Sequence, residues 1–312
     1  MIGALGGGIG ASKLLLGLCQ AIDPTDLTII VNTGDDFFLH GLTICPDLDT
    51  VMYTLAGVAD RERGWGIEND TFHALDWLGR YGREAWFNLG DRDLATHLHR
   101  TVLLREGRTL TDVTEIIRRS LGVRARLLPM TNDPVPTIVL TDHGPRPLQE
   151  YLVRDSARHR IQGVRFEGVE RSRPAPGVLE AIEAAHGIIL CPSNPIISIG
   201  PILAVPGIRE ALRRTGAPIV GISPVIGGRS LKGPTDKFLI GLGYEVSALS
   251  VARLYQDLLD LFIIDRADTD LLPAFEALPI TATTADTVMR NLEAKTSLAK
   301  ETLSCLMSVR PR

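Results

Sequence analysis

The 312-residue chain has little of what marks secreted, membrane-bound or nucleic-acid-binding proteins. Its four cysteines are scattered and form no Cys-x-x-Cys pair, so we expect reduced thiols and no disulfide framework. The N-terminal residues lack the basic start of a signal peptide, and no apolar run approaches the ~20 residues of a membrane span. The formal net charge of −4 gives no electrostatic reason for a nucleic-acid partner. We therefore expect a cytoplasmic protein that contacts neither membranes nor nucleic acid.

Apolar strand patterns alternate with helix patterns along the chain. Residues 27–31, 187–191 and 218–222 are continuous apolar runs, and each is stopped by a segment rich in Gly, Pro, Ser or Asn. Such runs are typical of a parallel sheet that is covered by helices on both faces. The pattern predicts an α/β fold, Rossmann-like and doubly wound, with a mainly parallel sheet. Helix patterns fall between the runs, at 176–185, 208–215 and 247–257.

The whole chain, 1–312, is predicted to form a single α/β domain. Residues 50–124 have mainly helical patterns, whereas residues 137–170 resemble short strands with a turn near His143. We interpret about 50–170 as an inserted helical and small-strand cap. The apolar run 258–264 fits a core strand better than an interface.

A glycine-rich turn, Gly6-Gly7-Gly8-Ile9-Gly10-Ala11-Ser12-Lys13, follows the first apolar run and precedes an amphipathic segment. Strand, turn and helix in this order place backbone N–H groups and a helix N-terminus against a phosphate. No packing reason for three consecutive glycines is evident from the sequence, and this favours a ligand-binding turn. The spacing of a P-loop is not met.

After the run 27–31, a segment of fifteen residues contains four aspartates: Asp35, Asp36, Asp47 and Asp49. Helix capping explains one of them but not all four. Carboxylates beside a phosphate-binding turn are the hard oxygen ligands that Mg²⁺ prefers when it also contacts phosphate. We therefore expect Mg²⁺ here, with at least one of these residues as its ligand.

Two further segments offer polar groups. Asp91-Arg92-Asp93 follows a glycine, and its arginine suits a phosphate because the guanidinium group donates two parallel hydrogen bonds. His97 and His99 are two residues apart and point in different directions on a helix, so we predict no metal site there. Ser193 and Asn194 stand between two prolines at the end of the run 187–191, where ligands bind in open α/β sheets.

Taken together, these motifs closely resemble the 2-phospho-L-lactate transferase family over residues 1 to about 286. The resemblance rests on the glycine turn, Asn32-Thr33-Gly34-Asp35-Asp36, Pro46-Asp47-Leu48-Asp49-Thr50, Trp65-Gly66-Ile67-Glu68-Asn69-Asp70-Thr71, Leu89-Gly90-Asp91-Arg92-Asp93 and Pro192-Ser193-Asn194-Pro195. Ala11-Ser12 departs from the residues that many members have before the lysine, and it should leave the turn intact.

The resemblance implies a reaction in coenzyme F-420 biosynthesis. The acceptor is the deazaflavin Fo (7,8-didemethyl-8-hydroxy-5-deazariboflavin), and the donor is a three-carbon phospho-acid joined to GMP through a diphosphate. The terminal ribityl hydroxyl of Fo attacks the phosphorus that bears the three-carbon acid, and GMP leaves. The acid is of the phospholactate, phosphoenolpyruvate or phosphoglycerate type, and family habit suggests a homodimer.

The expected roles of the site residues divide between chemistry and binding. Asp49, Asp36 and Arg92 are predicted to be catalytic, and the family's Fo contacts fall on Asp49 and Asn88. The metal is assigned to the four aspartates. Nucleotide and diphosphate binding is assigned to Gly6, Gly7, Gly8, Gly10, Ser12, Lys13, Ser193 and Asn194.

Two alternatives stay open at this point. A nicotinamide-dependent oxidoreductase would use the same glycine turn and an acidic residue such as Asp35 or Asp36 for the ribose. Regulatory nucleotide-sugar-binding proteins of the gluconeogenesis-factor type share the expected fold. Their second segment typically reads Asp-Asp-Gly-Gly-Ser-Ser-Gly, whereas Phe37-Phe38 follows Asp36 here.

Overall fold

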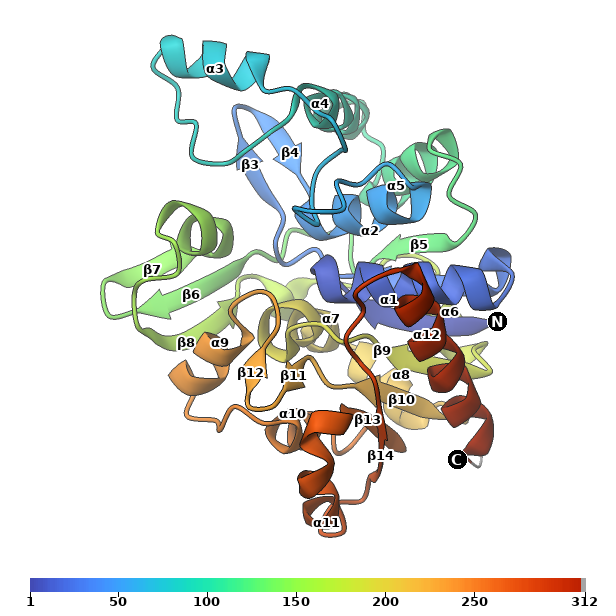
Figure 1. Cartoon of the computed structure of the whole chain (residues 1–312). Coiled ribbons are helices and arrows are strands. Elements are labelled where there is room, and N and C mark those ends of the chain that lie inside the picture. Colours follow the sequence, from blue (N-terminus) through green and yellow to red (C-terminus); the bar gives the residue numbers. More distant parts are fainter. Residues whose placement is uncertain (310–312) are drawn as a thin grey trace.

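The computed structural model describes residues 1–309 around a seven-stranded central sheet (Figure 1). The strand order is β14-β13-β10-β9-β1-β2-β5, and each neighbouring pair is parallel. The strands are β1 (Ile2–Gly6), β2 (Leu27–Val31), β5 (Arg126–Pro129), β9 (Gly187–Leu190), β10 (Ile219–Ile222), β13 (Leu261–Asp265) and β14 (Thr281–Ala285). The predicted α/β class and its parallel sheet are confirmed.

Helices cover both faces of this sheet, and each face has its own apolar core. Ala4 and Leu5 illustrate why, because successive strand residues point to opposite faces and these two enter different cores. One face packs on α1 (Gly8–Ala21), α2 (Pro46–Ala56), α5 (Leu110–Ser120) and α12 (Leu292–Ser308). The other packs on α6 (Val178–Glu183), α7 (Gly200–Ala204), α8 (Ile208–Arg214), α10 (Ala248–Leu254) and α11 (Leu272–Phe275). The run 258–264 is core, as predicted.

The topology creates a crevice beside β1. From β1 the chain continues to β2 and then β5 on one side of the sheet, whereas β9, β10, β13 and β14 extend from the other side. The connections that leave β1 and β9 therefore diverge, and ligands in open α/β sheets bind at such a switch point. The glycine turn follows β1, the aspartate segment follows β2, and Ser193 follows β9.

The additions to the sheet differ from the predicted single insertion at 50–170. One part holds the hairpin β3 (Phe37–Leu39) and β4 (Leu42–Ile44) with α3 (His73–Arg80) and α4 (Asp91–Arg105), at the top of the view in Figure 1. The other holds the antiparallel strands β6 (Thr137–Thr141), β7 (Gly144–Pro147) and β8 (Ile161–Phe166) with the π-helix η2 (Glu150–Arg154). Between them, β5 pairs with β2 in the central sheet. In β5 only Leu127 and Leu128 form an apolar run, between Arg126 and Pro129, and this is too little to separate the strand from its helical surroundings.

The remaining described elements are short. They are η1 (Pro24–Asp26), η3 (Val169–Arg171), η4 (Pro195–Ile199), β11 (Val225–Ile226), β12 (Arg229–Ser230), α9 (Thr235–Gly241) and η5 (Arg266–Leu271). Within residues 1–309, no individual helix combines the length and apolar composition of a membrane span. The helices at Pro195–Ala204 and Ile208–Arg214 meet both requirements only as a pair, and this pair is bent by 85°.

Candidate active site

The glycine turn presents the open N-terminus of α1 to a cavity. Gly7 occupies the N-cap position and no side chain caps the helix there. Gly8 has a φ of +69°, a conformation that only glycine adopts without strain. The first turn of α1 therefore offers backbone N–H groups and the positive end of the helix dipole to an anion.

The glycines also have packing reasons, and here the sequence-based argument was wrong. A side chain at Gly7 would overlap the Asp47 carboxylate, and one at Gly10 would overlap the Pro192 carbonyl. Gly6 lies between Ala11 and Cys191 with no room for a methyl group. Most of these neighbours come from distant parts of the chain, so the sequence alone could not reveal them. The glycines bring the aspartate segment and the Pro192 loop into contact with the turn.

A cavity of about 540 Å³, here called the basic cavity, opens in front of this turn. Burial lowers the pKa of Lys13, and the charges of Lys232 and Lys295 lower it further, so positive charge is concentrated here. The lining includes Gly7, Gly8, Gly10, Lys13, Asp35, Asp47, Ser193, Asn194, Lys232 and Arg290. An anionic group would be stabilised in this cavity.

The loop after β9 closes one side of the basic cavity. Ser193 Oγ bonds the Gly7 carbonyl (3.0 Å) and the Gly7 N–H (3.3 Å), which fastens this loop to the glycine turn. Asn194 Oδ1 accepts from the backbone N–H groups of η4, whereas its Nδ2 is buried without a hydrogen-bond partner among residues 1–309. Asn194 therefore has an amide donor to give to a ligand. Ser12 instead donates to the Ile9 carbonyl at 3.0 Å and does not line the cavity.

The four aspartates separate into two pairs. In the first, Asn32 Nδ2 donates to Asp35 Oδ1 and to Asp47 Oδ2, each at 2.9 Å. Burial and the charge of Asp47 raise the pKa of Asp35 well above its ordinary value. Burial raises the pKa of Asp47 to about 6, although the N–H groups of Asn32 and Gly8 oppose this. Two buried carboxylates that share one amide donor are short of positive charge.

The second pair is Asp36 and Asp49, and both lie near Arg100. Arg100 donates to both oxygens of Asp49, through Nη1 at 3.0 Å and through Nη2. Burial lowers the pKa of Arg100, but the Asp49 charge, the hydrogen bond to Asp49 and the neighbouring Cys45 and Tyr53 together raise this pKa above its ordinary value, so the guanidinium stays charged. Asp36 lies near this ion pair, and burial raises its pKa well above the ordinary value. Its Oδ1 is buried and has no hydrogen-bond partner in the described part of the chain.

A buried network from α4 surrounds Asp49. Arg100 Nη1 also lies 3.1 Å from His97 Nδ1, and because arginine only donates, the His97 proton belongs on Nε2. This nitrogen is 3.2 Å from Asp93 Oδ1 but makes no hydrogen bond within the described residues. Tyr53 donates to the same Asp93 oxygen at 2.8 Å. Asp49, Asp93 and His97 are close enough for a metal, but Arg100 already supplies the positive charge among them. His99 is exposed.

This network lines a second cavity of about 390 Å³, here called the aromatic cavity. Tyr53, Trp65 and Phe87 give it aromatic walls, and Asn88 lies exposed beside Phe87. A third cavity, about 630 Å³, lies under the β3–β4 hairpin and includes Asp36, Phe37 and Trp86.

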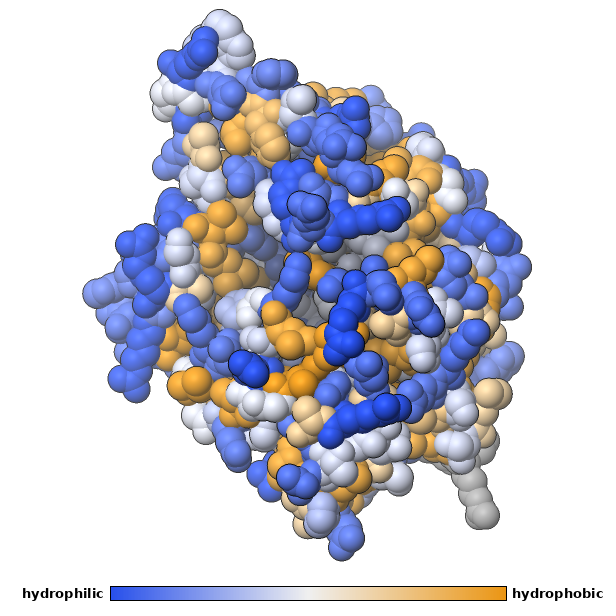
Figure 2. Space-filling model, in the orientation of Figure 1, coloured by the Kyte–Doolittle hydropathy of each residue, from blue (hydrophilic) through white to orange (hydrophobic). Residues whose placement is uncertain are grey.

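The three cavities meet around the aspartates. Leu152 lines both the basic and the aromatic cavity, and Gln149, which lines the aromatic and the third cavity, donates to Asp35 Oδ2 at 3.1 Å. Figure 2 shows a hollow near the centre of the view, with hydrophobic residues at its rim. The arrangement can hold an anionic ligand and a planar ligand that reach one another at the aspartates.

The Asp91-Arg92-Asp93 segment divides between structural and site residues. Asp91 accepts from Thr71, His73 and Ala74 at the start of α3, and Asp70 accepts from the Arg92 and Asp93 N–H groups at the start of α4. The exposed Arg92 side chain lies 3.3 Å from the Glu68 carbonyl and lines none of the three cavities. The structure therefore does not place Arg92 in the predicted catalytic position; Arg100 is the arginine beside the aspartates.

Some site residues escaped the sequence analysis. Asn32 opens the aspartate segment, and Gln149 comes from the other addition to the sheet. A signal for the α4 residues was available, because Asp93, His97 and Arg100 stand at i, i+4 and i+7 and so share one helix face.

Comparisons with known proteins agree over nearly the whole chain. The sequence model of the family described as 2-phospho-L-lactate transferase CofD matches residues 2–298. A phosphoenolpyruvate transferase from Streptomyces coelicolor is 45% identical over 312 residues, 98% of this chain and 98% of the relative. A 2-phospho-L-lactate transferase from Methanosarcina mazei is 42% identical over 294 residues, 94% of this chain and 96% of the relative.

A solved structure supports the fold alone. The crystal structure of a UPF0052 family protein from Bacillus halodurans has a TM-score of 0.66 to this chain at 19% identity. The alignment covers 97% of this chain and 98% of that protein.

Proposed function

The chain belongs to the 2-phospho-L-lactate transferase family, and we propose from this and the cavity geometry that it joins a phospho-acid to a deazaflavin in coenzyme F-420 biosynthesis. It is a transferase of the phospholactate and phosphoenolpyruvate type. The proposed acceptor is Fo, and the proposed donor is a three-carbon phospho-acid linked to GMP through a diphosphate. The products are GMP and a phosphodiester.

One observation carries this proposal: a basic cavity and an aromatic cavity meet at the buried aspartates. The basic cavity suits the guanosine nucleotide and diphosphate, because Lys13, Lys232 and Arg290 neutralise negative charge there. The walls of Tyr53, Trp65 and Phe87 suit the planar deazaflavin ring. A transferase needs its two substrates to meet, and Leu152 borders both cavities.

On the donor side, backbone groups do most of the binding. The N–H groups of Ile9 and Gly10 in the first turn of α1 would hold a phosphate, because the Gly8 N–H already donates to Asp47, and Asn194 Nδ2 would donate to the nucleotide. Ser193 holds the loop against Gly7 and so positions Asn194 rather than binding through its own hydroxyl.

Asp35 and Asp47 fit Mg²⁺ better than the other two aspartates do. Their carboxylates are hard oxygen donors, they converge on one amide, and they lack a cationic side chain that is bonded to them among residues 1–309. Asp49 is bound by Arg100 and therefore has less to gain from a metal. When bound, Mg²⁺ would neutralise the charge that develops on the diphosphate during transfer. Asp35 and Asp47 would hold it at the border of the basic cavity.

On the acceptor side, Asp49 and Asn88 would contact Fo. Arg100 fixes both Asp49 oxygens, so this carboxylate is held in one orientation at the base of the aromatic cavity. Asn88 lies at the exposed part of the same cavity. The two residues would contact the acceptor at different depths of the aromatic cavity.

The chemical step needs a proton acceptor for the ribityl hydroxyl. The oxygen of this hydroxyl attacks phosphorus, the bond from phosphorus to the GMP oxygen breaks, and the hydroxyl proton is lost. Asp36 suits this role, because its Oδ1 is unpartnered within residues 1–309 and burial raises its pKa well above the ordinary value, which makes the carboxylate a better proton acceptor. Positioning and charge neutralisation supply the rest.

Two finer points belong to the same proposal. The donor's acid is of the phospholactate, phosphoenolpyruvate or phosphoglycerate type, and these differ by single groups that one or two polar contacts distinguish. The active form is proposed to be a homodimer.

The test incubates the protein with Fo, Mg²⁺ and each GMP-activated acid in turn. Mass spectrometry should detect a phosphodiester of Fo with one acid in preference to the others, and chromatography should detect an equal amount of GMP. Absence of product with all three acids, together with absence of Fo and GDP binding, would contradict the proposal. Binding without turnover would instead mean that the true acid was not among the three.

A further inference from the structure

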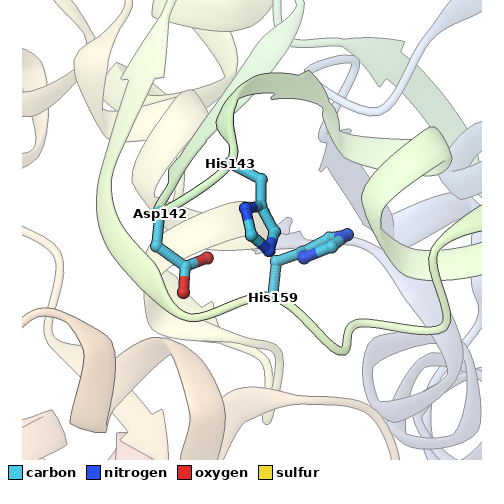
Figure 3. Close-up of side chains that lie close together, drawn as sticks. All are labelled: Asp142, His143 and His159. Atoms are coloured by element: carbon cyan, nitrogen blue, oxygen red, sulfur yellow. The ribbon is translucent and has the colours of Figure 1, made fainter.

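Three side chains with metal-ligand chemistry lie together at one end of the β6–β7–β8 sheet and line none of the three cavities (Figure 3). Asp142 and His143 form the two-residue turn between β6 and β7, and His159 lies just before β8. One ligand atom from each lies within 4.8 Å of the other two. We propose that Asp142, His143 and His159 bind a transition-metal dication such as Zn²⁺.

The backbone holds the three residues in this arrangement. Asp142 N–H donates to the Arg160 carbonyl, and Asp142 Oδ1 accepts from the Arg160 N–H, each at 3.1 Å. Thr141 Oγ1 accepts from the His143 N–H at 3.1 Å and donates to the Gly144 carbonyl at 2.8 Å. The turn is therefore tied both to itself and to the segment that carries His159. These hydrogen bonds fix the backbone of the turn and the Asp142 carboxylate.

The two imidazole rings lie in contact and leave nitrogen atoms for a metal. Their centroids are 4.6 Å apart and the rings are nearly perpendicular, at 83°. In Figure 3 one nitrogen of His159 lies beside His143 and the other points away from the group. His159 Nε2 is 3.9 Å from Asp155 Oδ2, and Arg146 Nε is 3.5 Å from the same oxygen, which is buried and accepts no hydrogen bond within the described chain. A carboxylate behind a histidine is how many proteins orient the ring toward a metal.

The donor set selects the class of ion. Imidazole nitrogen suits zinc and its neighbours in the first transition row, whereas Mg²⁺ prefers oxygen ligands. Two histidines and one carboxylate with a water molecule make a common four-coordinate zinc site. Ligand atoms about 2 Å from one ion lie at most about 4 Å apart, so small movements of these side chains close the set.

The position of the site suggests what the metal would do. His143 and His159 flank residues 144–158, and this segment contains Gln149, Leu152 and Val153 of the aromatic cavity. A metal bound by both histidines would close this segment into a loop and restrict its motion. The metal would thereby stabilise η2, which forms one wall of the aromatic cavity.

The experiment titrates Zn²⁺ into the untagged full chain by calorimetry. The variants are His143→Gln and His159→Gln, and the matched control is His99→Gln, which alters an exposed histidine of α4 outside the group. Wild type and His99→Gln should bind one more equivalent of Zn²⁺ than His143→Gln and His159→Gln do. Asp155→Asn should bind the same number of Zn²⁺ equivalents as wild type, but with about tenfold lower affinity.

Thermal unfolding supplies a second measurement. Zn²⁺ should raise the unfolding temperature of wild type by more than that of His159→Gln, because a ligand stabilises the state that binds it. Equal stoichiometry and affinity in wild type, His143→Gln and His159→Gln would overturn the proposal. Loss of the same equivalent in His99→Gln would overturn it too, since the ion would then be bound elsewhere.

Discussion

The basic cavity and the aromatic cavity are built in different ways. The basic cavity is lined largely by loops at the carboxyl ends of parallel strands, and its glycines, Asp35 and Ser193 lie at positions that the sheet topology fixes. The aromatic cavity is lined by residues of α2, α4 and the segments around Trp65, Phe87 and Leu152, which only tertiary packing brings together. One half of the site is therefore set by strand order, and the other by how helices pack outside the sheet. The following predictions test this division.

The largest effect is expected for the buried ion pair of the aromatic cavity. Arg100→Met should lower the free energy of unfolding by about 3–5 kcal/mol and abolish transfer, because it leaves the Asp49 carboxylate buried without its partner. Chemical denaturation and turnover assays measure both. Arg92→Met, in the exposed first turn of the same helix, is the matched control and should change stability by no more than about 0.5 kcal/mol. Comparable loss of turnover in Arg92→Met, with its fold intact, would return Arg92 to the catalytic role that the sequence suggested.

The next effect concerns the metal at the border of the basic cavity. Asp47→Asn should reduce transfer by about 10²–10³-fold, because one of the two proposed Mg²⁺ ligands is lost where charge develops in the transition state. Initial rates at saturating substrate and increasing Mg²⁺ measure this loss. Near-full turnover of Asp47→Asn at high Mg²⁺ would exclude Asp47 as a ligand.

The same residue predicts a pH dependence of stability. Burial raises the pKa of Asp47 from 3.8 to about 6, so between these values the folded chain holds a proton that the unfolded chain has lost. The free energy of unfolding of the metal-free protein should therefore fall as pH rises from about 4 to about 6. In Asp47→Asn this fall should be smaller, and the variant should be more stable than wild type at pH 7.5 without Mg²⁺. Parallel pH profiles of the two proteins would show that Asp47 is not the source.

A smaller and more local effect is expected at the glycine turn. Gly8→Val should weaken GDP binding by at least about tenfold while Fo binding is largely retained, because a side chain at a φ of +69° strains the turn that holds the phosphate. Gly57→Val, at a φ of +73° after α2, imposes similar strain outside the basic cavity and serves as the control. Calorimetric titration measures both ligands. Undiminished GDP affinity in Gly8→Val would place the nucleotide elsewhere.

The smallest effect is expected for Asn88. Asn88→Ala should raise the KM for Fo several-fold and leave the KM for the donor unchanged, because an exposed polar contact contributes about 1 kcal/mol. Steady-state kinetics with each substrate varied in turn separates the two constants. Equal changes in both would mean that Asn88 supports the architecture rather than the acceptor.

The same division explains what the sequence could predict. The strands β1, β2, β9 and β10 follow from continuous apolar runs, and the loops after them could be placed at one edge because parallel strands end together. The pairing of Asp49 with Arg100 depends on how α2 and α4 pack, and the residues are 51 positions apart. Likewise, β5 was missed because its apolar run consists of Leu127 and Leu128 alone. Residues tied to strand order are predictable from one sequence, whereas helix-to-helix pairs outside the sheet require the structure.

The central claim is that the four aspartates form two pairs with separate substrates. Calorimetric titration of GDP with Mg²⁺, and of Fo, into wild type, Asp47→Asn and Asp49→Asn tests it most directly, with unfolding curves to confirm that both variants are folded. Asp47→Asn should lose the Mg²⁺-dependent part of GDP affinity and keep Fo affinity, whereas Asp49→Asn should lose Fo affinity and keep Mg²⁺-dependent GDP binding. Equal loss of Mg²⁺-dependent GDP affinity in both variants would contradict the claim and show that the aspartates act as one metal cluster.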